Sequence, residues 1–481
     1  MTTPPVPLLA LYVLLVAPAA GAILSLVPDV RASEWIARTA SLATVAAGVA
    51  LLVVSADGRW GSYLGLDELS DLFVATVAGI YATSTWYSRR YLRSVARPYL
   101  SGSAYYALLS TFSFAMLATL VVTDLGLMWI GIEATTIASA LLVILERKPT
   151  SVEAAWRYTI IASAGLTLAL FALILLYGAT GTLDAFRLAA DPPALTLPLE
   201  MAVALALVGY GTKVGLFPMH TWLPDAHSEA PSPVSAMLSG VLLPSALYAF
   251  LRVYRVLPPP VPGALSDLVL AFGLVTALVA AFLIQNQRSY KRMLAYSSME
   301  VMGLAVAGVA IGGVALYGAL VLLVAHAFAK SAAFYCAGNV LQETGTTRID
   351  EVRNLRDRLP WTGAAWVLSA LGVTGAPPFG SFLGELLIVV GALAVGNYLA
   401  AGLLVVAVLV AFLGVNVQVG RMVFGGGASG SGAGGPDRAS EGGIGFAYLN
   451  VAVALALGLV SLPYLTPAIR GAALVLGGSL P

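Results

Sequence analysis

The stretch MAVALALVGYGTKVGLFPMHTWLP, residues 201–224, has the length and apolar composition of a membrane-spanning helix. It nevertheless contains Lys213, which is the only formal charge in the stretch. Glycines surround this lysine and Pro218 follows it, so the helix is expected to break nearby. A lysine at the centre of a bilayer costs about 2.5–3.5 kcal/mol on insertion scales, and such residues usually face a polar interior. The stretch therefore predicts a broken membrane helix with a functional lysine.

The composition of the whole chain is that of a membrane protein. Hydrophobic residues make up 59% and charged residues 10%, whereas an ordinary soluble domain carries about 25% charged residues. The net charge of +1 provides no field for nucleic acid, so no nucleic-acid partner is expected. One cysteine, Cys336, and three histidines cannot build an iron–sulfur cluster or a multi-histidine haem site. We therefore expect no cofactor and no metal site in this chain.

Apolar segments of about 20 residues recur along nearly the whole sequence. They predict an all-α polytopic membrane protein with about fourteen transmembrane helices. The expected spans are 7–27, 36–54, 69–86, 104–122, 125–145, 154–177, 199–217, 233–251, 265–284, one that starts after 292, 315–340, one from 361 through 385 with an interruption at 375–378, 398–419 and 444–462.

Basic residues gather in the loops after the third, fifth, ninth and eleventh expected spans. They are Arg89, Arg90, Arg93, Arg97, Arg147, Lys148, Arg288, Lys291, Arg292, Arg348, Arg353, Arg356 and Arg358. All four loops follow odd-numbered spans and therefore lie on one side, which the positive-inside rule makes cytoplasmic. Both termini are then expected on the non-cytoplasmic side of the cell membrane, with Arg252 and Arg255 going against the trend.

Expected spans seven and twelve are both broken by glycine and proline near one ionisable residue, Lys213 in the first and Glu385 in the second. Such a pair indicates an inverted-repeat transporter with its site at the breaks. The expected repeats are two five-helix units, spans four to eight and nine to thirteen. The expected divisions are 1–100 for the first three spans, 101–257 and 258–421 for the repeats, 422–443 for a flexible glycine- and serine-rich linker, and 444–481 for the last span and tail.

Five ionisable residues, both acids and bases, fall near the middle of expected spans. They are Glu133, Lys213, His326, Lys330 and Glu385. His326 and Lys330 are four residues apart and share one helical face. A proton relay needs groups that exist both charged and neutral, and burial favours this. A structural ion pair would explain one Glu–Lys pair, but five such residues favour a proton pathway.

Three further residues leave two interpretations open. His220 and His227 follow the break after Lys213, where they either cap backbone carbonyls or form a proton entry. Glu300 lies about two turns into the tenth expected span, where it either makes a structural hydrogen bond or joins the proton pathway.

Four blocks of sequence resemble a known superfamily. TKVGLFPMHTWLPDAHSEAPSPVSAMLSGVL resembles the core signature of the antiporter-like subunits of respiratory complex I, multi-subunit Na+/H+ antiporters and energy-converting hydrogenases. RSYKRMLAYSSMEVMG, HAFAKSAAFYCAGNV and GAPPFGSFLGELL resemble its other blocks in the same order, over roughly residues 66–421. WIGIEATTIASALLV and the glutamate of YSSMEVMG look most like component F of hydrogenase-4.

The resemblance implies a non-catalytic, proton-translocating subunit of a complex I-like oxidoreductase complex in the cell membrane. Its partners would be other membrane-arm subunits and a cytoplasmic redox or hydrogenase arm, whose subunits would hold iron–sulfur and nickel–iron centres. Glu133 and Lys213 would form the controlling ion pair of the first half-channel. Lys330, with His326 one turn before it, would be the central relay, and Glu385 the terminal residue.

The sequence departs from the superfamily pattern in the eighth expected span. Many relatives have a lysine in a GVLLK-like run, where this chain reads GVLLP with Pro244. Ser239 stands where some relatives have a histidine. The link from Lys213 to Lys330 would then pass through water, serines or His220. The other functions that remain open are a subunit of an Na+/H+ antiporter complex, a gradient-coupled module for inorganic carbon uptake, and a non-pumping membrane scaffold.

Overall fold

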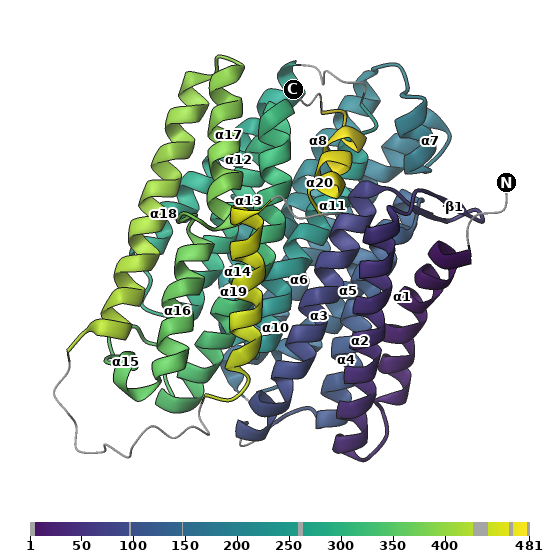
Figure 1. Ribbon diagram of the computed structural model, residues 1–481. Coiled ribbons are helices and arrows are strands. Elements are labelled where there is room, and N and C mark those ends of the chain that lie inside the picture. Colours follow the sequence, from purple (N-terminus) through teal and green to yellow (C-terminus); the bar gives the residue numbers. More distant parts are fainter. Residues whose placement is uncertain are drawn as a thin grey trace.

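The computed structural model describes residues 5–95, 98–146, 148–257, 263–426, 441–460 and 465–478. Its long helices lie side by side in one bundle (Figure 1). The first half of the chain contains α1 (Pro5–Leu24), α2 (Val30–Val54), β1 (Gly58–Trp60), β2 (Leu64–Leu66), α3 (Glu68–Ser94), α4 (Gly102–Val121), α5 (Leu125–Val143), α6 (Pro149–Thr180), α7 (Ala185–Ala190), α8 (Leu197–Val214), η1 (Met219–Thr221), α9 (Trp222–Glu229), α10 (Ser232–Met237), η2 (Leu238–Leu242) and α11 (Leu243–Tyr254).

The second half is also helical wherever it is described. It contains α12 (Gly263–Gln285), α13 (Tyr290–Ile311), α14 (Gly313–Thr344), α15 (Leu355–Arg358), α16 (Pro360–Val373), α17 (Gly380–Ala394), α18 (Tyr398–Phe424), α19 (Ile444–Leu459) and α20 (Leu465–Val475). Most of the expected linker, residues 427–440, lies outside the described residues, as do Arg97 and Arg147.

The expected all-α membrane fold is confirmed. Among the described residues, eleven helical segments are long and apolar enough to cross a membrane. The other expected spans coincide with α3, with the α16–α17 pair and with α19. Two small features were not predicted: the antiparallel hairpin β1–β2, in which Arg59 pairs with Gly65, and α20, which packs on α3 where only an apolar tail was expected.

Both predicted helix breaks are present, and both helices end with the same backbone device. After α8, Gly215 adopts a positive φ of 87°, and the Leu216 N–H donates to the Gly211 carbonyl at 2.8 Å. After α16, Gly375 has a φ of 64°, and the Ala376 N–H donates to the Leu371 carbonyl at 2.9 Å. Glycine has no Cβ to clash in this left-handed conformation, so it stops each helix while satisfying a terminal carbonyl.

The eighth expected span differs from a regular α-helix. Its middle turn, η2, is π-helical over Leu238–Leu242. Pro244 lies two residues after this turn and has no N–H to donate into an α-helical turn, which gives a physical reason for the wider winding. The turn packs against α14, since a Cβ on Gly240 would lie 3.0 Å from the Ala327 carbonyl oxygen.

The basic loops meet at one end of the bundle. Isolated backbone bridges join Pro98 to Glu146 and Ser289 to Arg348. The α14–α16 connection, with α15, lies at the lower end in Figure 1, whereas α7 and the β1–β2 hairpin lie at the upper end. Arg252, which goes against the charge trend, is 5% exposed and donates to both carboxylate oxygens of Asp67 at 2.6 Å. It is therefore a paired structural charge.

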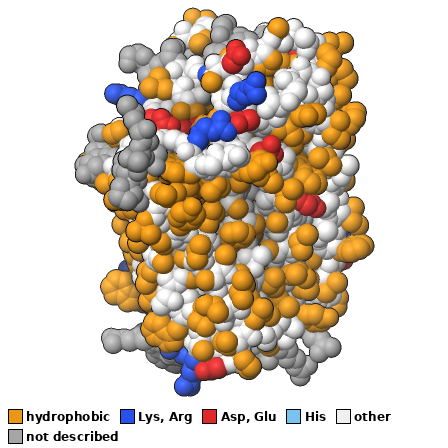
Figure 2. Space-filling model, turned by 90° about the vertical axis from the view of Figure 1, so that its right-hand side faces the viewer, with side chains coloured by type: hydrophobic (Ala, Val, Ile, Leu, Met, Phe, Trp, Pro, Cys, Tyr) orange, Lys and Arg blue, Asp and Glu red, His pale blue; other side chains and the backbone are white. Residues whose placement is uncertain are grey.

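Hydrophobic side chains cover most of the face shown in Figure 2, and charged side chains gather towards its two ends. Large apolar residues are exposed along the bundle, among them Trp156 at 68% and Leu399 at 75%. Such a surface fits lipid or a partner membrane subunit and not water.

Candidate proton-pathway site

Lys213 lies in the last turn of α8 and is fully buried. Its ammonium group donates to the Thr136 hydroxyl of α5 at 2.7 Å and to the Tyr158 hydroxyl of α6. It also lies 4.5 Å from the centre of the Tyr158 ring. The carbonyl end of a helix carries partial negative charge, which favours a cation here. The break after α8 therefore places a buried cation among neutral oxygen acceptors and an aromatic face.

Glu133 lies on α5, but it does not pair directly with Lys213. Its Oε1 atom accepts a hydrogen bond from Ser163 at 2.6 Å, while its Oε2 atom is buried without a hydrogen-bond partner. Among the described residues, no ion pair joins Glu133 to Lys213, although the two are near enough to interact electrostatically. The ion pair implied by the resemblance is thus open in this structure, because each group is held by neutral partners.

His227 occupies the gap between the two halves of the site. It is fully buried on α9, its Nδ1 atom lies 2.8 Å from the Leu223 carbonyl, and its Nε2 atom has no hydrogen-bond partner. Its ring lies 6.1 Å from that of Trp222, which in turn lies 5.9 Å from the Lys213 ammonium. On its other side it interacts electrostatically with Lys330.

His220 lies apart from this line. Its ring stacks on Phe217 with centroids 5.7 Å apart and lies 6.3 Å from Tyr296. Sequence reasoning treated the two histidines alike because both follow the break. The structure places only His227 between Lys213 and Lys330.

Lys330 and its neighbours form the second half of the site on α13 and α14. The Lys330 ammonium is fully buried and donates to the Leu294 carbonyl at 2.9 Å and to the Ser297 hydroxyl. Glu300 is 3% exposed and interacts electrostatically with Lys330. His326 is fully buried, and neither of its ring nitrogens has a hydrogen-bond partner among the described residues.

Glu385 lies in the second turn of α17, after the second break. Its carboxylate packs directly against Gly375, because a Cβ built on that glycine would overlap it. The side chain points back towards the start of α17, whose partial positive charge favours an anion. Glu385 also interacts electrostatically with Glu300. Glu300 thus interacts electrostatically with both Lys330 and Glu385.

A contact between two serines joins the eighth expected span to α13. The Ser239 hydroxyl, in η2, lies 2.6 Å from the Ser298 hydroxyl of α13. This contact joins the π-helical turn to the helix that also holds Glu300. A polar contact is therefore present at Ser239, five residues before Pro244.

Sequence reasoning missed a polar cavity at the basic end. It has a volume of about 370 Å³, and its lining includes Glu146, Glu229 and Lys291. Lys291 is 1% exposed and donates to the Ala230 carbonyl, three residues after His227. Burial by itself raises the pKa of the Glu146 carboxyl, but hydrogen bonding and charge from Lys148 outweigh it, so this pKa lies below its usual range. A lysine at a span end is typical of a topology signal, so its sequence position gave no sign of this cavity.

Comparisons with known proteins identify the family of this chain. Residues 122–411 match the family described as NADH:quinone oxidoreductase/Mrp antiporter, transmembrane, and the chain belongs to that family. It is 34% identical over 401 residues to a hydrogenase-4 component F homolog of Methylacidiphilum infernorum, covering 80% of this chain and 83% of the relative. It is 32% identical over 360 residues to NADH-quinone oxidoreductase subunit N of Desulforudis audaxviator, covering 73% and 70%.

The fold is shared with a solved relative of low sequence identity. A chain of respiratory complex I from Thermus thermophilus superposes with a TM-score of 0.83 at 23% identity, covering 98% of this chain and all (100%) of that chain. The protein is therefore a polytopic membrane subunit of the antiporter-like type. Among the described residues, no group of three or more His, Cys, Asp or Glu side chains is arranged to hold a metal ion.

Proposed function

We propose that this chain translocates protons across the cell membrane as an antiporter-like subunit of a complex I-like complex. The observation that carries the proposal is the line of buried ionisable side chains that connects the two helix breaks. Its members are Lys213, His227, Lys330, Glu300 and Glu385. Family membership and the hydrogenase-4 component F and subunit N relatives support the same role.

The proposed route begins at the polar cavity beside Lys291 and reaches the buried line near His227. From His227 a proton passes to Lys330, then to Glu300, and leaves from Glu385 at the second break. Water completes the steps for which no hydrogen bond joins neighbouring groups, as is usual for proton relays inside membranes. His326 shares a helical face with Lys330 and offers the relay a second acceptor.

Lys213 and Glu133 control the route electrostatically. When Glu133 approaches Lys213, the positive charge at the first break is neutralised, and when they separate, that charge repels a proton further along the line. Moving one charge against 100 mV takes about 2.3 kcal/mol. Two unit charges 4 Å apart interact by about 4 kcal/mol at an effective dielectric constant of 20, so one pair suffices in magnitude.

The position of Glu133 supports control by a neighbouring subunit. Its side chain is only partly buried, and Ile130 and Ile137 on the same helix are 55% and 60% exposed. The Glu133 carboxylate itself is hydrogen-bonded or buried, but it lies beside this exposed apolar face, and an ionisable group so close to lipid is costly, so a partner subunit is expected to cover this face of α5. We further propose that the partner complex carries a cytoplasmic redox or hydrogenase arm with iron–sulfur and nickel–iron centres. The basic end then faces the cytoplasm, and both chain termini face away from it.

The repeat organisation is part of the same proposal. We take residues 101–257 and 258–421 as two inverted five-helix units, each with one broken helix. The shared ending at Gly215 and Gly375 supports this division. Lys213 precedes its break and lies at a helix C-terminus, whereas Glu385 follows its break and lies near a helix N-terminus, so each charge lies at the helix end that favours it.

The test is Lys213→Ala in the intact complex, reconstituted into liposomes, with Arg356→Ala as a control that removes an exposed basic residue outside the polar cavity. We expect the Lys213 variant to lose proton pumping while the redox turnover of the partner subunits continues, and the control to pump normally. Pumping at the wild-type rate by Lys213→Ala would contradict the proposal. Replacing sodium by choline in the same assay separates proton pumping from sodium–proton exchange, because only the latter stops.

A further inference from the structure

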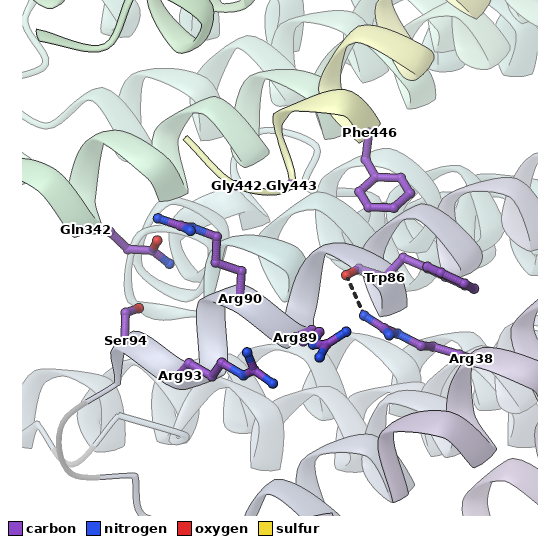
Figure 3. Close-up of a pocket in the computed structure, with 10 residues that line it drawn as sticks. All are labelled: Arg38, Trp86, Arg89, Arg90, Arg93, Ser94, Gln342, Gly442, Gly443 and Phe446. Carbon is purple, nitrogen blue, oxygen red and sulfur yellow. Dashed lines mark hydrogen bonds between the residues drawn. The ribbon is translucent and has the colours of Figure 1, made fainter. Parts of the chain in front are cut away.

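A second cluster of charges lies at the basic end, far along the chain from the proton-pathway residues. A cavity of about 470 Å³ opens between α2, α3 and the start of α19, and Arg38, Arg89, Arg90, Arg93, Trp86 and Phe446 are among its lining residues. Figure 3 shows the four arginine side chains arranged around one opening, with Arg90 on the Gln342 side and Arg38 beside Trp86.

The cavity holds an excess of positive charge. Glu34 pairs with Arg38 at 2.7 Å and with Arg89 at 3.2 Å. In the described part of the chain, no carboxylate pairs with Arg90 or Arg93. The Nε atoms of Arg38 and Arg90 are buried without a hydrogen-bond partner, and Arg38 is 4% exposed. A buried donor left unsatisfied is costly, so these groups indicate an anion that the described part of the chain does not supply.

An apolar cavity adjoins the basic one and shares Trp86 and Phe446 with it. It has a volume of about 440 Å³, and its lining includes Leu42, Gly79, Phe328, Leu449 and Val453. Leu42 and Leu449 are 51% and 52% exposed, so this cavity opens to the membrane-facing surface. The two cavities together form a groove with a cationic end and an apolar end.

The length of this groove matches one leaflet of a bilayer. It follows α3 from Gly79 to Arg93, which is about 21 Å at 1.5 Å per residue. Half of a hydrocarbon core is about 15 Å, and the headgroup region adds about 5–7 Å. Trp86 lies between the two ends, where tryptophan is preferred at the boundary between acyl chains and headgroups.

We propose that the groove binds one anionic phospholipid. Arg89, Arg90 and Arg93 hold the phosphate through charge-assisted hydrogen bonds, for which the planar guanidinium is well suited. An acyl chain lies in the apolar cavity against Phe328 and Val453. The lipid thereby supplies the missing acceptors and fills the space between α2 and α19.

The test is native mass spectrometry of the full chain, purified alone and within its membrane complex, with phosphatidylglycerol or phosphatidylcholine added. The key variant is the pair Arg90→Gln and Arg93→Gln. We expect phosphatidylglycerol to bind the wild-type chain more tightly, and the double variant to bind it roughly thirtyfold more weakly, at about fivefold for each arginine. The matched control is Arg288→Gln with Arg356→Gln, which removes two exposed charges at the same end and leaves binding unchanged.

A second arm identifies the source of the phosphate. Val453→Trp fills the apolar cavity from a partly buried position and should weaken phosphatidylglycerol binding, and inorganic phosphate at millimolar concentration should not displace the lipid. Thermal unfolding of each variant verifies that it is folded. Equal binding of both lipids, equal binding by the double variant and its control, displacement by inorganic phosphate, or a complex in which a partner subunit covers the arginines and no lipid binds would each overturn the proposal.

Discussion

Replacing Tyr158 by phenylalanine tests how Lys213 is held in its present position. The substitution removes the hydroxyl that accepts from the Lys213 ammonium and keeps the ring beneath it. A hydrogen bond to a charged group contributes about 1.5–3 kcal/mol, and each 1.4 kcal/mol is about a factor of ten. The ratio of molecules with a closed Glu133–Lys213 ion pair to molecules with an open one should therefore be about ten- to hundredfold higher than in the wild type. The Ser139 hydroxyl also loses its hydrogen bond with the Tyr158 hydroxyl, but it still donates a hydrogen bond to the Thr135 carbonyl at 2.6 Å.

The measurement is proton uptake into liposomes that contain the purified complex, with redox turnover recorded in parallel. We expect Tyr158→Phe to pump about tenfold more slowly or worse, because a closed Glu133–Lys213 pair no longer changes the field along the line. Tyr210→Phe is the matched control, since the Tyr210 hydroxyl on α8 is buried without a hydrogen-bond partner in the described part of the chain. Equal pumping by the two variants would refute the assignment of Tyr158 as the group that holds the pair open.

Two further predictions concern stability and the second break. Asp67→Asn should destabilise the chain by about 3 kcal/mol in thermal or denaturant unfolding, because it leaves Arg252 buried without its charge partner. Burial by itself raises the pKa of the Asp67 carboxyl, but the charge of Arg252 outweighs it, so this pKa lies below its usual value. The stability that the ion pair contributes should therefore be present above about pH 4 and should be lost as the pH falls through the folded-state pKa. Gly375→Ala should cost about 1–2 kcal/mol for its left-handed conformation and also displace the Glu385 carboxylate, so pumping should fall with it. Gly402→Ala, at a helical position with nothing within 4 Å, should not lower stability, because alanine favours a helix over glycine, and should leave pumping unchanged.

Hydropathy and the placement of glycine and proline were enough to predict the helices and both breaks. These signals are local: an apolar stretch of about 20 residues has to be helical to satisfy its backbone in lipid. Gly215 and Gly375 stop their helices where the sequence predicts, and Lys213 is as buried as its surroundings imply. The π-helical turn before Pro244 was not predicted, because proline in a span predicts a kink without specifying how the helix accommodates it.

The arrangement of the site was less accessible from sequence, since it depends on which helices pack together. Glu133 and Lys213 were expected to touch, but Ser163 and Thr136 take their hydrogen bonds instead. The sequence left His227 as either a capping histidine or a proton-pathway residue, and its place in the pathway stays a prediction, because its Nδ1 atom lies 2.8 Å from the Leu223 carbonyl while α9 packs against α6 and α13. Contacts between side chains that are distant along the chain leave no periodic pattern in the sequence, so only the packing of the helices in the structure reveals them.

The contrast between two kinds of buried charge explains why the structure favours transport over a scaffold. Arg252 meets Asp67 through two charge-assisted hydrogen bonds, which fixes both groups in their ionised forms. Lys213 and Lys330 instead donate their hydrogen bonds only to hydroxyl and carbonyl oxygens. In the described part of the chain, no carboxylate lies within ion-pair distance of either lysine. A cation held by neutral dipoles can lose its proton without leaving an opposite charge stranded, whereas a bidentate ion pair cannot. A chain that only needed mechanical cohesion would gain nothing from leaving these lysines unpaired, because apolar residues of the same size would be at least as stable there.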